Sequence, residues 1–256
     1  LLVEGASSTA FLFAVRPVIV GLTIVSLATS APELLVSLVA AVKGSGGISI
    51  GNILGSNAIN IALVLGISAI VKPVAIHGQI IKVEIPYMIG VSVVFWVLCM
   101  DSHIGRGDGF ILLGLLFVFL AYSLITAKEK IDITVPPAPA PQLKRILKNI
   151  VLIAGGIVML AYGANFVVGE AIDIAQKIGL SQTFIGISIV ALGTSLPELA
   201  TSAVAAAKGE NDISVGNVIG SNLFNICLVM GTVGLLNPMD LDPELHRFQF
   251  PFMIFI

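Results

Sequence analysis

The sequence predicts an all-α membrane protein built from two inverted repeats, and three observations lead to this fold class. The composition is apolar, with 57% hydrophobic residues, 11% charged residues and a mean hydropathy of +1.05, whereas soluble domains carry about 25% charged residues. Long apolar segments follow one another along the chain. One stretch of the first half recurs in the second half.

The apolar segments are expected to be transmembrane helices. Only helices and closed barrels satisfy their backbone hydrogen bonds in lipid, and these segments are too long and too uniformly apolar for barrel strands. They run over about 1–15, 18–42, 48–71, 85–100, 110–127, 148–175, 183–207, 213–236 and 247–256. A span needs roughly 20 apolar residues, so the short first and last segments lead us to expect a longer protein.

A proline-rich linker divides the chain. Residues 128–147, "KEKIDITVPPAPAPQLKRIL", include four prolines within 136–141 and favour an extended connection. The expected parts are a first repeat over 1–127 with a partial first helix, the linker, and a second repeat over 148–256 truncated in its fourth helix. Nine loop lysines and arginines fall on the linker's side of the membrane and four on the other, which predicts a cytoplasmic linker.

The two halves are related by duplication. Residues 21–66 align without a gap with 186–231, and 27 of the 46 positions are identical. The polar residues match best, although lipid does not select for them. The helix at 183–207 is the fifth expected transmembrane segment after the one at 18–42. Because this number is odd, the two copies enter the membrane from opposite sides. Inverted repeats of this kind are typical of secondary transporters, whose substrate site lies near the midplane where the repeats meet.

Each copy places a glutamate beside a proline inside an apolar segment: Glu33 in "SLATSAPELLVS" and Glu198 in "ALGTSLPELATS". An ionised carboxylate at the bilayer centre costs at least ~2.5 kcal/mol, and neither helix interior has a lysine or arginine to pair with it. A protonated glutamate in a structural hydrogen bond is the alternative, but a symmetric pair favours a mobile cation. Pro32 and Pro197 predict a kink or unwinding through the "ATS" and "GTS" turns.

Helical spacing places further polar groups beside each glutamate. The shared faces are Thr29, Glu33 and Ser37 with Asn52, Ser56 and Asn60, and in the second copy Thr194, Glu198 and Ser202 with Asn217, Ser221 and Asn225. Carboxylate, amide, hydroxyl and carbonyl oxygens suit Ca²⁺ or Na⁺ and argue against zinc, copper or iron. Because two ionised glutamates neutralise one Ca²⁺ or two Na⁺, we hypothesise that one cargo exchanges for the other.

The repeated motifs carry a family resemblance. "GLTIVSLATSAPELLVSLVAAVKG" with "GNILGSNAINIALVLG", and "GISIVALGTSLPELATSAVAAAKG" with "GNVIGSNLFNICLVMG", resemble the two α-repeats of the cation/calcium exchanger superfamily, in particular the prokaryotic sodium/calcium antiporters. The resemblance implies a ten-helix fold, of which this chain holds parts of the first and ninth helices and lacks the tenth. It also implies Ca²⁺/Na⁺ antiport by alternating access in a prokaryotic cell membrane.

The resemblance further implies a ligand set. The acidic pair is Glu33 and Glu198, and the other implied ligands are the hydroxyls of Ser30, Ser195, Ser56 and Ser221, the backbone carbonyls of Thr29 and Thr194, and the amides of Asn60 and Asn225. Some sodium/calcium exchangers and the potassium-dependent branch have an aspartate at the position of Asn225. An amide there removes a possible third negative charge, which leaves ion stoichiometry and potassium coupling open.

Several alternatives stay open at this stage. A proton/calcium antiporter of the same superfamily would share the fold, although its repeats carry an asparagine-alanine-x-glutamate phrase in place of "TSxPE". A potassium-dependent sodium/calcium antiporter and a cation channel are further candidates. We expect no enzyme activity and no cofactor. The expected partners are the transported Ca²⁺ and Na⁺ and the lipid bilayer, with no nucleic acid and no obligate protein partner.

Overall fold

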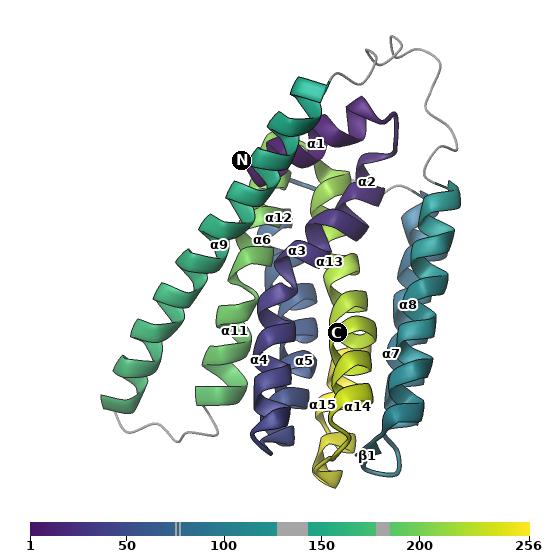
Figure 1. Cartoon of the computed structure of the whole chain (residues 1–256), viewed down its shortest axis with the longest axis vertical. Helices are drawn as coiled ribbons and strands as arrows, with labels where there is room; N and C mark the ends of the chain where they lie inside the picture. The colour runs from purple at the N-terminus through teal and green to yellow at the C-terminus, as the bar shows by residue number, and fades with distance from the viewer. Residues whose placement is uncertain (75, 77, 127–142, 178–184) are drawn as a thin grey trace.

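The computed structural model describes residues 1–256 with the exception of 75, 77, 127–142 and 178–184. The described residues form a bundle of helices, most of which run along the long axis of the molecule (Figure 1). The helical fold class is therefore confirmed. Cys99 and Cys227 are buried free thiols, as expected from their apolar surroundings.

The first half of the chain contains one leading helix followed by the first repeat. Its elements are α1 (Leu2–Leu12), α2 (Pro17–Val20), the π-helix η1 (Gly21–Val25), α3 (Ser26–Thr29), α4 (Ala31–Val42), α5 (Gly46–Ile59), the π-helix η2 (Asn60–Leu65), α6 (Gly66–Val71), the π-helix η3 (Ile80–Glu84), α7 (Ile85–Leu98), the short strand β1 (His103–Ile104) and α8 (Arg106–Thr126).

The second half has a longer leading helix and follows the same order as far as α14, after which the strand β2 precedes the next helix. Its elements are α9 (Leu143–Lys177), the π-helix η4 (Ile185–Val190), α11 (Ala191–Thr194), α12 (Leu196–Lys208), α13 (Asn211–Leu223), the π-helix η5 (Phe224–Met230), α14 (Gly231–Leu236), the strand β2 (Met239–Asp240), the 3₁₀ turn η6 (Pro243–His246) and α15 (Gln249–Phe255).

The two repeats run in opposite directions. In Figure 1, α3 and α4 lead down toward the end that carries β1, whereas α11 and α12 lead up and away from it. The next helices are inverted in the same way, because α5 and α6 rise while α13 and α14 descend. This inversion agrees with the odd number of spans counted between the two copies.

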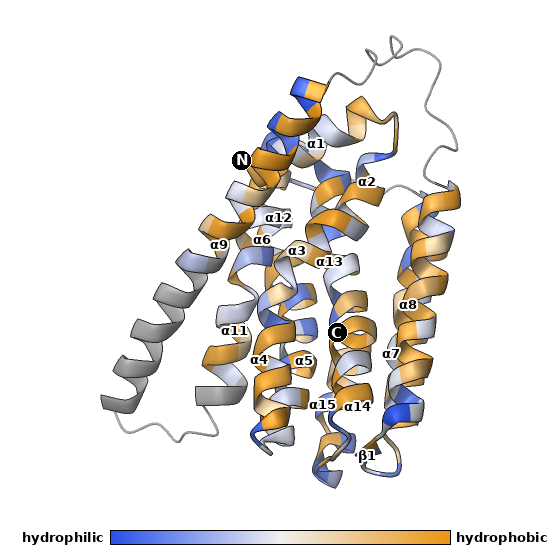
Figure 2. Ribbon diagram, viewed as in Figure 1, coloured by the Kyte–Doolittle hydropathy of each residue, from blue (hydrophilic) through white to orange (hydrophobic). Residues whose placement is uncertain are grey.

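Four of the described helices are long and apolar enough to cross a membrane, and the number rises to six if each of two bent helix pairs is counted as one span. Four are continuous, namely Gly46–Val71, Ile80–Leu98, Arg106–Thr126 and Asn211–Leu236. Two are broken, since Pro17–Thr29 meets Ala31–Val42 at 42° and Ser188–Thr194 meets Leu196–Lys208 at 45°. Figure 2 shows that α4, α7 and α8 are mostly hydrophobic along their length, while hydrophilic segments also occur in the middle of the bundle around α3 and α5. The chain is a multi-pass membrane protein.

Three helix starts and one small ribbon differ from the sequence-based expectation. The span expected from 110 begins at Arg106. The span expected from 85 begins at Ile80. The later start was expected because Lys82 and Glu84 are charged and look like loop residues, but Glu84 is only 1% exposed. The helix expected from 148 begins at Leu143, and the remainder of the predicted linker lies outside the described residues. The ribbon is formed by β1 and β2, which pair in antiparallel register with His103 opposite Asp240. No local sequence pattern predicts this pairing.

The centre of the bundle is where α13 meets the first repeat. A Cβ atom on Gly216 would lie 2.7 Å from the Val18 carbonyl oxygen and 3.1 Å from the Leu22 nitrogen. Only a glycine fits against this backbone, so the two repeats approach more closely than side chains would allow. Leu22 at this contact is fully buried, as is Leu223 further along α13.

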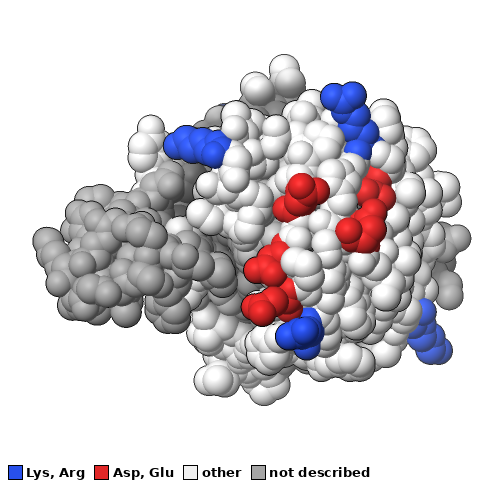
Figure 3. Space-filling view, turned by 90° about the horizontal axis from the view of Figure 1, so that it is seen from below, with Lys and Arg blue, Asp and Glu red and all other residues white. Residues whose placement is uncertain are grey.

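The end of the molecule that carries β1 and β2 is rich in acidic residues. Figure 3 views this end and shows Asp and Glu side chains near the middle of the face, with Lys and Arg toward its edge. Asp101, Asp240, Asp242 and Glu244 are exposed residues of this region. Which side of the membrane this end faces stays a prediction of the lysine and arginine count.

Candidate functional site

The site begins with two broken helices. Ser30 and Ser195 interrupt the helices with nearly identical backbone angles, φ −82° and ψ 2° against φ −84° and ψ 1°. Pro32 and Pro197 follow within the first turn of the new helix, where a missing N–H is tolerated. The predicted kinks are confirmed, but the interruption is confined to these single serines and does not extend through the whole "ATS" and "GTS" turns.

Both glutamates lie at the centre of the protein beside these breaks. Glu33 and Glu198 are 0% exposed. Each accepts a hydrogen bond from the serine of the opposite repeat: Ser195 Oγ lies 3.5 Å from Glu33 Oε1, and Ser30 Oγ lies 3.4 Å from Glu198 Oε1. The two hydrogen bonds cross the repeat boundary in opposite directions and place both carboxylates at the same junction.

Neither carboxylate has a basic partner among the described residues. The ion pairs in that part of the chain are His103 with Asp240 and Lys148 with Glu4, both in exposed regions. The second oxygen of each buried glutamate, Oε2, has no hydrogen-bond partner within the part of the chain that the structure describes. A buried carboxylate oxygen without a partner is costly, so this pair requires a cation or protons for compensation.

The two threonines connect each break to the other repeat. Thr29 Oγ1 donates to Asn217 Oδ1 at 3.2 Å and lies 3.3 Å from Ser221 Oγ. Its counterpart Thr194 donates to Asn52 Oδ1 at 3.2 Å and lies 3.4 Å from Ser56 Oγ. These contacts bring the predicted threonines and serines together at one place.

The predicted amides lie one helical turn beyond these serines. Asn60 begins η2 and Asn225 is the second residue of η5, and π-helical turns of this kind are frequent at functional sites. Both residues are 0% exposed, and the side-chain oxygen of each has no hydrogen-bond partner among the described residues. With the glutamates they give four buried oxygens of the predicted site that lack a described partner: Glu33 Oε2, Glu198 Oε2, Asn60 Oδ1 and Asn225 Oδ1.

All ten sequence-predicted site residues are buried at this junction of the repeats, with exposures of 6% or less. The described residues contain no group of three or more His, Cys, Asp or Glu side chains that could hold a metal ion. The available donors are therefore two carboxylates supplemented by neutral oxygens, a set suited to hard cations.

Two further members of this cluster, Asn57 and Asn222, were not predicted from the sequence. They are 1% and 2% exposed and hydrogen-bond to Asn225 and Asn60 respectively. Their signal was present in the sequence, since both belong to the phrase "GSN" that occurs in each repeat. They lie off the face that carries Asn52, Ser56 and Asn60, so spacing alone did not select them.

Comparison with known proteins gives consistent matches along the chain. The family described as "Sodium/calcium exchanger protein" matches residues 1–125 and 148–256. The "Inner membrane protein YrbG" of Escherichia coli is 34% identical over 261 residues, covering 100% of this chain and 80% of that protein. The "Sodium/calcium exchanger MaX1" of Methanosarcina acetivorans is 30% identical over 291 residues, covering 99% of this chain and 83% of that protein.

A solved structure supports the same relationship. The sodium-calcium exchanger NCX_Mj, in a structure with Na⁺ and Ca²⁺ soaked in, superposes with a TM-score of 0.83 at 30% sequence identity. The match covers 99% of this chain and 82% of that one. Fold and sequence therefore agree over nearly the whole length described.

Proposed function

The chain belongs to the sodium/calcium exchanger protein family, and from this premise we propose that it exchanges Ca²⁺ for Na⁺ across a cell membrane, holding the cations between Glu33 and Glu198. Members of the family are transporters, so the chain is a cation/Ca²⁺ antiporter of a prokaryotic cell membrane and not an enzyme. The choice of ions and the residues that bind them are the parts that we propose.

The observation that carries the proposal is the set of four unpartnered oxygens at matched positions of the two repeats. Buried polar atoms are nearly always hydrogen-bonded. Here two carboxylate and two amide oxygens at the repeat junction lack a partner among the described residues. The hydroxyls of Ser30 and Ser195 contact the two glutamates, and those of Ser221 and Ser56 contact Thr29 and Thr194. Ca²⁺ takes about 6 to 8 oxygen ligands of these types, and Na⁺ also prefers hard oxygen donors.

The charge of the site supports exchange as the mode of transport. Two ionised glutamates carry a charge of −2, which one Ca²⁺ or two Na⁺ neutralise. A loaded site is then tolerated in the membrane, whereas an empty, doubly charged site is strongly penalised. Reorientation therefore favours the loaded protein, and the inverted repeats with their broken helices supply two related arrangements for alternating access.

The backbone carbonyls of the breaks complete the proposed ligand set. Because Pro32 and Pro197 have no N–H, the carbonyls of Ala28 and Gly193 lose their helical donors, and the carbonyls of Thr29 and Thr194 lie next to them in the chain. Irregular backbone of this kind is tolerated at membrane depth where it is buried in protein or lines a cavity. No resident cofactor takes part in this proposal, since the cations are the substrates.

The test is Ca²⁺ uptake into proteoliposomes that contain the purified protein. An outward Na⁺ gradient, a K⁺ gradient and a pH gradient are imposed in turn. We expect uptake with internal Na⁺ and its loss in both Glu33→Gln and Glu198→Gln. Glu84→Gln is the matched control, because Glu84 is an equally buried glutamate of another span and its neutralisation should leave uptake at the parent level.

The other outcomes separate the alternatives. Uptake that the pH gradient drives without Na⁺ would assign the chain to proton/calcium exchange, and an additional K⁺ requirement would assign it to the potassium-dependent branch. Uptake without any counter-ion would indicate a channel. Parent-level uptake in either glutamate variant would refute the role proposed for the pair.

A further inference from the structure

Two asparagines outside the proposed ligand set join the repeats directly behind it. Asn57 of α5 and Asn222 of α13 are 165 positions apart and occupy the same place in the two repeats. Asn225 Nδ2 donates to Asn57 Oδ1 at 3.0 Å, and Asn60 Nδ2 donates to Asn222 Oδ1 at 3.1 Å. Each hydrogen bond crosses from one repeat to the other.

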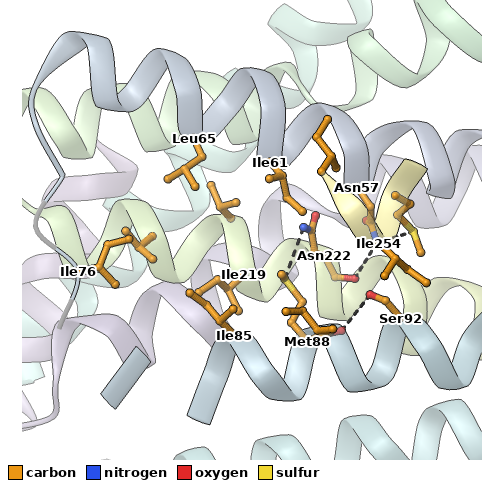
Figure 4. A pocket seen from close by; sticks show the side chains of 15 residues that line it. Asn57, Ile61, Leu65, Ile76, Ile85, Met88, Ser92, Ile219, Asn222 and Ile254 are labelled. Atoms are coloured by element: carbon orange, nitrogen blue, oxygen red, sulfur yellow. Dashed lines mark hydrogen bonds between the residues drawn. The ribbon is translucent and has the colours of Figure 1, made fainter. Parts of the chain in front are cut away.

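The donors of these two asparagines have partners of their own. Asn57 Nδ2 donates to the Asn222 backbone oxygen at 3.3 Å and lies 3.8 Å from Met253 Sδ, while Asn222 Nδ2 lies 3.6 Å from Met88 Sδ. The two methionines are also 165 positions apart. Figure 4 shows Asn57, Asn222 and Met88 converging at one cavity, with these contacts as dashed lines.

This pattern fixes the direction of the amides that carry the unpartnered oxygens. With their N–H groups directed at a backbone oxygen and at sulfur, Asn57 and Asn222 offer only their oxygens to Asn225 and Asn60. Those two residues must therefore donate, which turns their own oxygens away from the contact. If Asn225 turned its amide over, two acceptor oxygens would face each other at hydrogen-bond distance, an unfavourable arrangement.

We propose that Asn57 and Asn222 are positioning residues that hold the side-chain oxygens of Asn225 and Asn60 toward the transported cation. The inference rests on the proposed function, because it assumes that the cation binds beside Glu33 and Glu198. It adds a cross-repeat dependence: each ligand amide of one repeat is oriented by an asparagine of the other. The sulfurs of Met253 and Met88 are weak acceptors that face the N–H groups of Asn57 and Asn222. No strong acceptor oxygen therefore stands on the methionine side to favour another orientation of these amides.

The test is a double-mutant cycle on Ca²⁺ affinity, measured by calorimetry on the purified protein with CaCl₂ as the titrant. Asn57→Leu keeps the approximate size of the side chain and removes the acceptor. We expect Ca²⁺ binding to weaken about tenfold, which corresponds to about 1.4 kcal/mol. Because Asn57 acts through Asn225, the double variant Asn57→Leu/Asn225→Leu should bind no more weakly than Asn225→Leu alone.

A conservative variant separates positioning from general stability. Asn57→Asp keeps the accepting oxygen and loses the donor, so positioning predicts Ca²⁺ binding at least as tight as in the parent. A purely structural role predicts that Asn57→Asp weakens binding as Asn57→Leu does. This variant decides the question even if Asn57→Leu does not fold. Ser92→Ala is the matched control, since Ser92 lines the same cavity and hydrogen-bonds only to the Met88 carbonyl among the described contacts.

The outcomes distinguish this inference from the proposed function. Additive losses in the cycle, or unchanged Ca²⁺ affinity in Asn57→Leu while Glu33→Gln abolishes binding, would overturn the positioning role alone. Parent-level Ca²⁺ affinity in Glu33→Gln would overturn the proposed site, and the positioning role with it. A weakened Ser92→Ala variant would show that the cavity matters for packing and would also count against positioning.

Discussion

Replacing Gly216 by alanine should destabilise the protein, because the added methyl group has no space. Its Cβ would lie 2.7 Å from the Val18 oxygen, 3.1 Å from the Leu22 nitrogen and 3.2 Å from the Gly21 Cα, all of them backbone atoms that cannot rotate away. Overpacking of this kind costs about 1 to 3 kcal/mol. Alanine recovers up to about 1 kcal/mol through its helix propensity. The expected net loss is therefore up to about 2 kcal/mol relative to the parent.

The assay is unfolding of the purified protein in detergent, followed by circular dichroism. Gly114→Ala is the matched control: Gly114 lies within α8, has no heavy atom within 4 Å of the position of a Cβ, and should be at least as stable as the parent after substitution. Gly216→Ala should also bind Ca²⁺ more weakly, since separating α13 from the first repeat lengthens the contact between Thr29 and Asn217. Equal stability of the two alanine variants would refute the close approach of the repeats.

Two further predictions concern single polar side chains. Ser195→Ala removes a hydroxyl that donates to Glu33 over a long contact of 3.5 Å. We expect a modest loss in Ca²⁺ affinity, about fivefold or about 1 kcal/mol, and an unchanged unfolding midpoint. An unaltered Ca²⁺ dissociation constant would contradict a role for this hydroxyl. Glu84→Leu removes a buried carboxyl group whose two oxygens have no hydrogen-bond partner among the described residues. The unfolding midpoint should rise, and Na⁺-driven Ca²⁺ uptake should persist. Loss of uptake in a folded variant would show that Glu84 takes part in transport.

The broad architecture could be predicted because its causes are local or repeated. Side chains that face lipid must be apolar, so the membrane segments stand out in the sequence. The kinks follow from Pro32 and Pro197. The inversion follows from the number of spans between two copies that can be aligned. Residues that share a helical face, such as Thr29 and Glu33, could likewise be grouped by spacing. These features need no knowledge of how distant parts of the chain meet.

The remaining features depend on contacts between distant residues. Lys82 and Glu84 read as loop residues because sequence polarity does not reveal that neighbouring helices bury Glu84. The ribbon of His103 with Asp240 joins residues far apart in the chain and has no local signal. The orientation of the Asn60 and Asn225 amides depends on Asn222 and Asn57 across the repeat boundary, so it could be recognised only after the repeats were placed together.

Competition between Na⁺ and Ca²⁺ at equilibrium tests the central claim most directly. Calcium binding to the purified protein is measured at increasing NaCl, with choline chloride keeping the ionic strength constant, for the parent and for the Glu33→Gln/Glu198→Gln variant. We predict that Na⁺ progressively lowers the apparent Ca²⁺ affinity of the parent and that the double variant binds no Ca²⁺. Calcium affinity that does not respond to Na⁺, or Ca²⁺ binding that survives without both carboxylates, would contradict a shared site between the two glutamates.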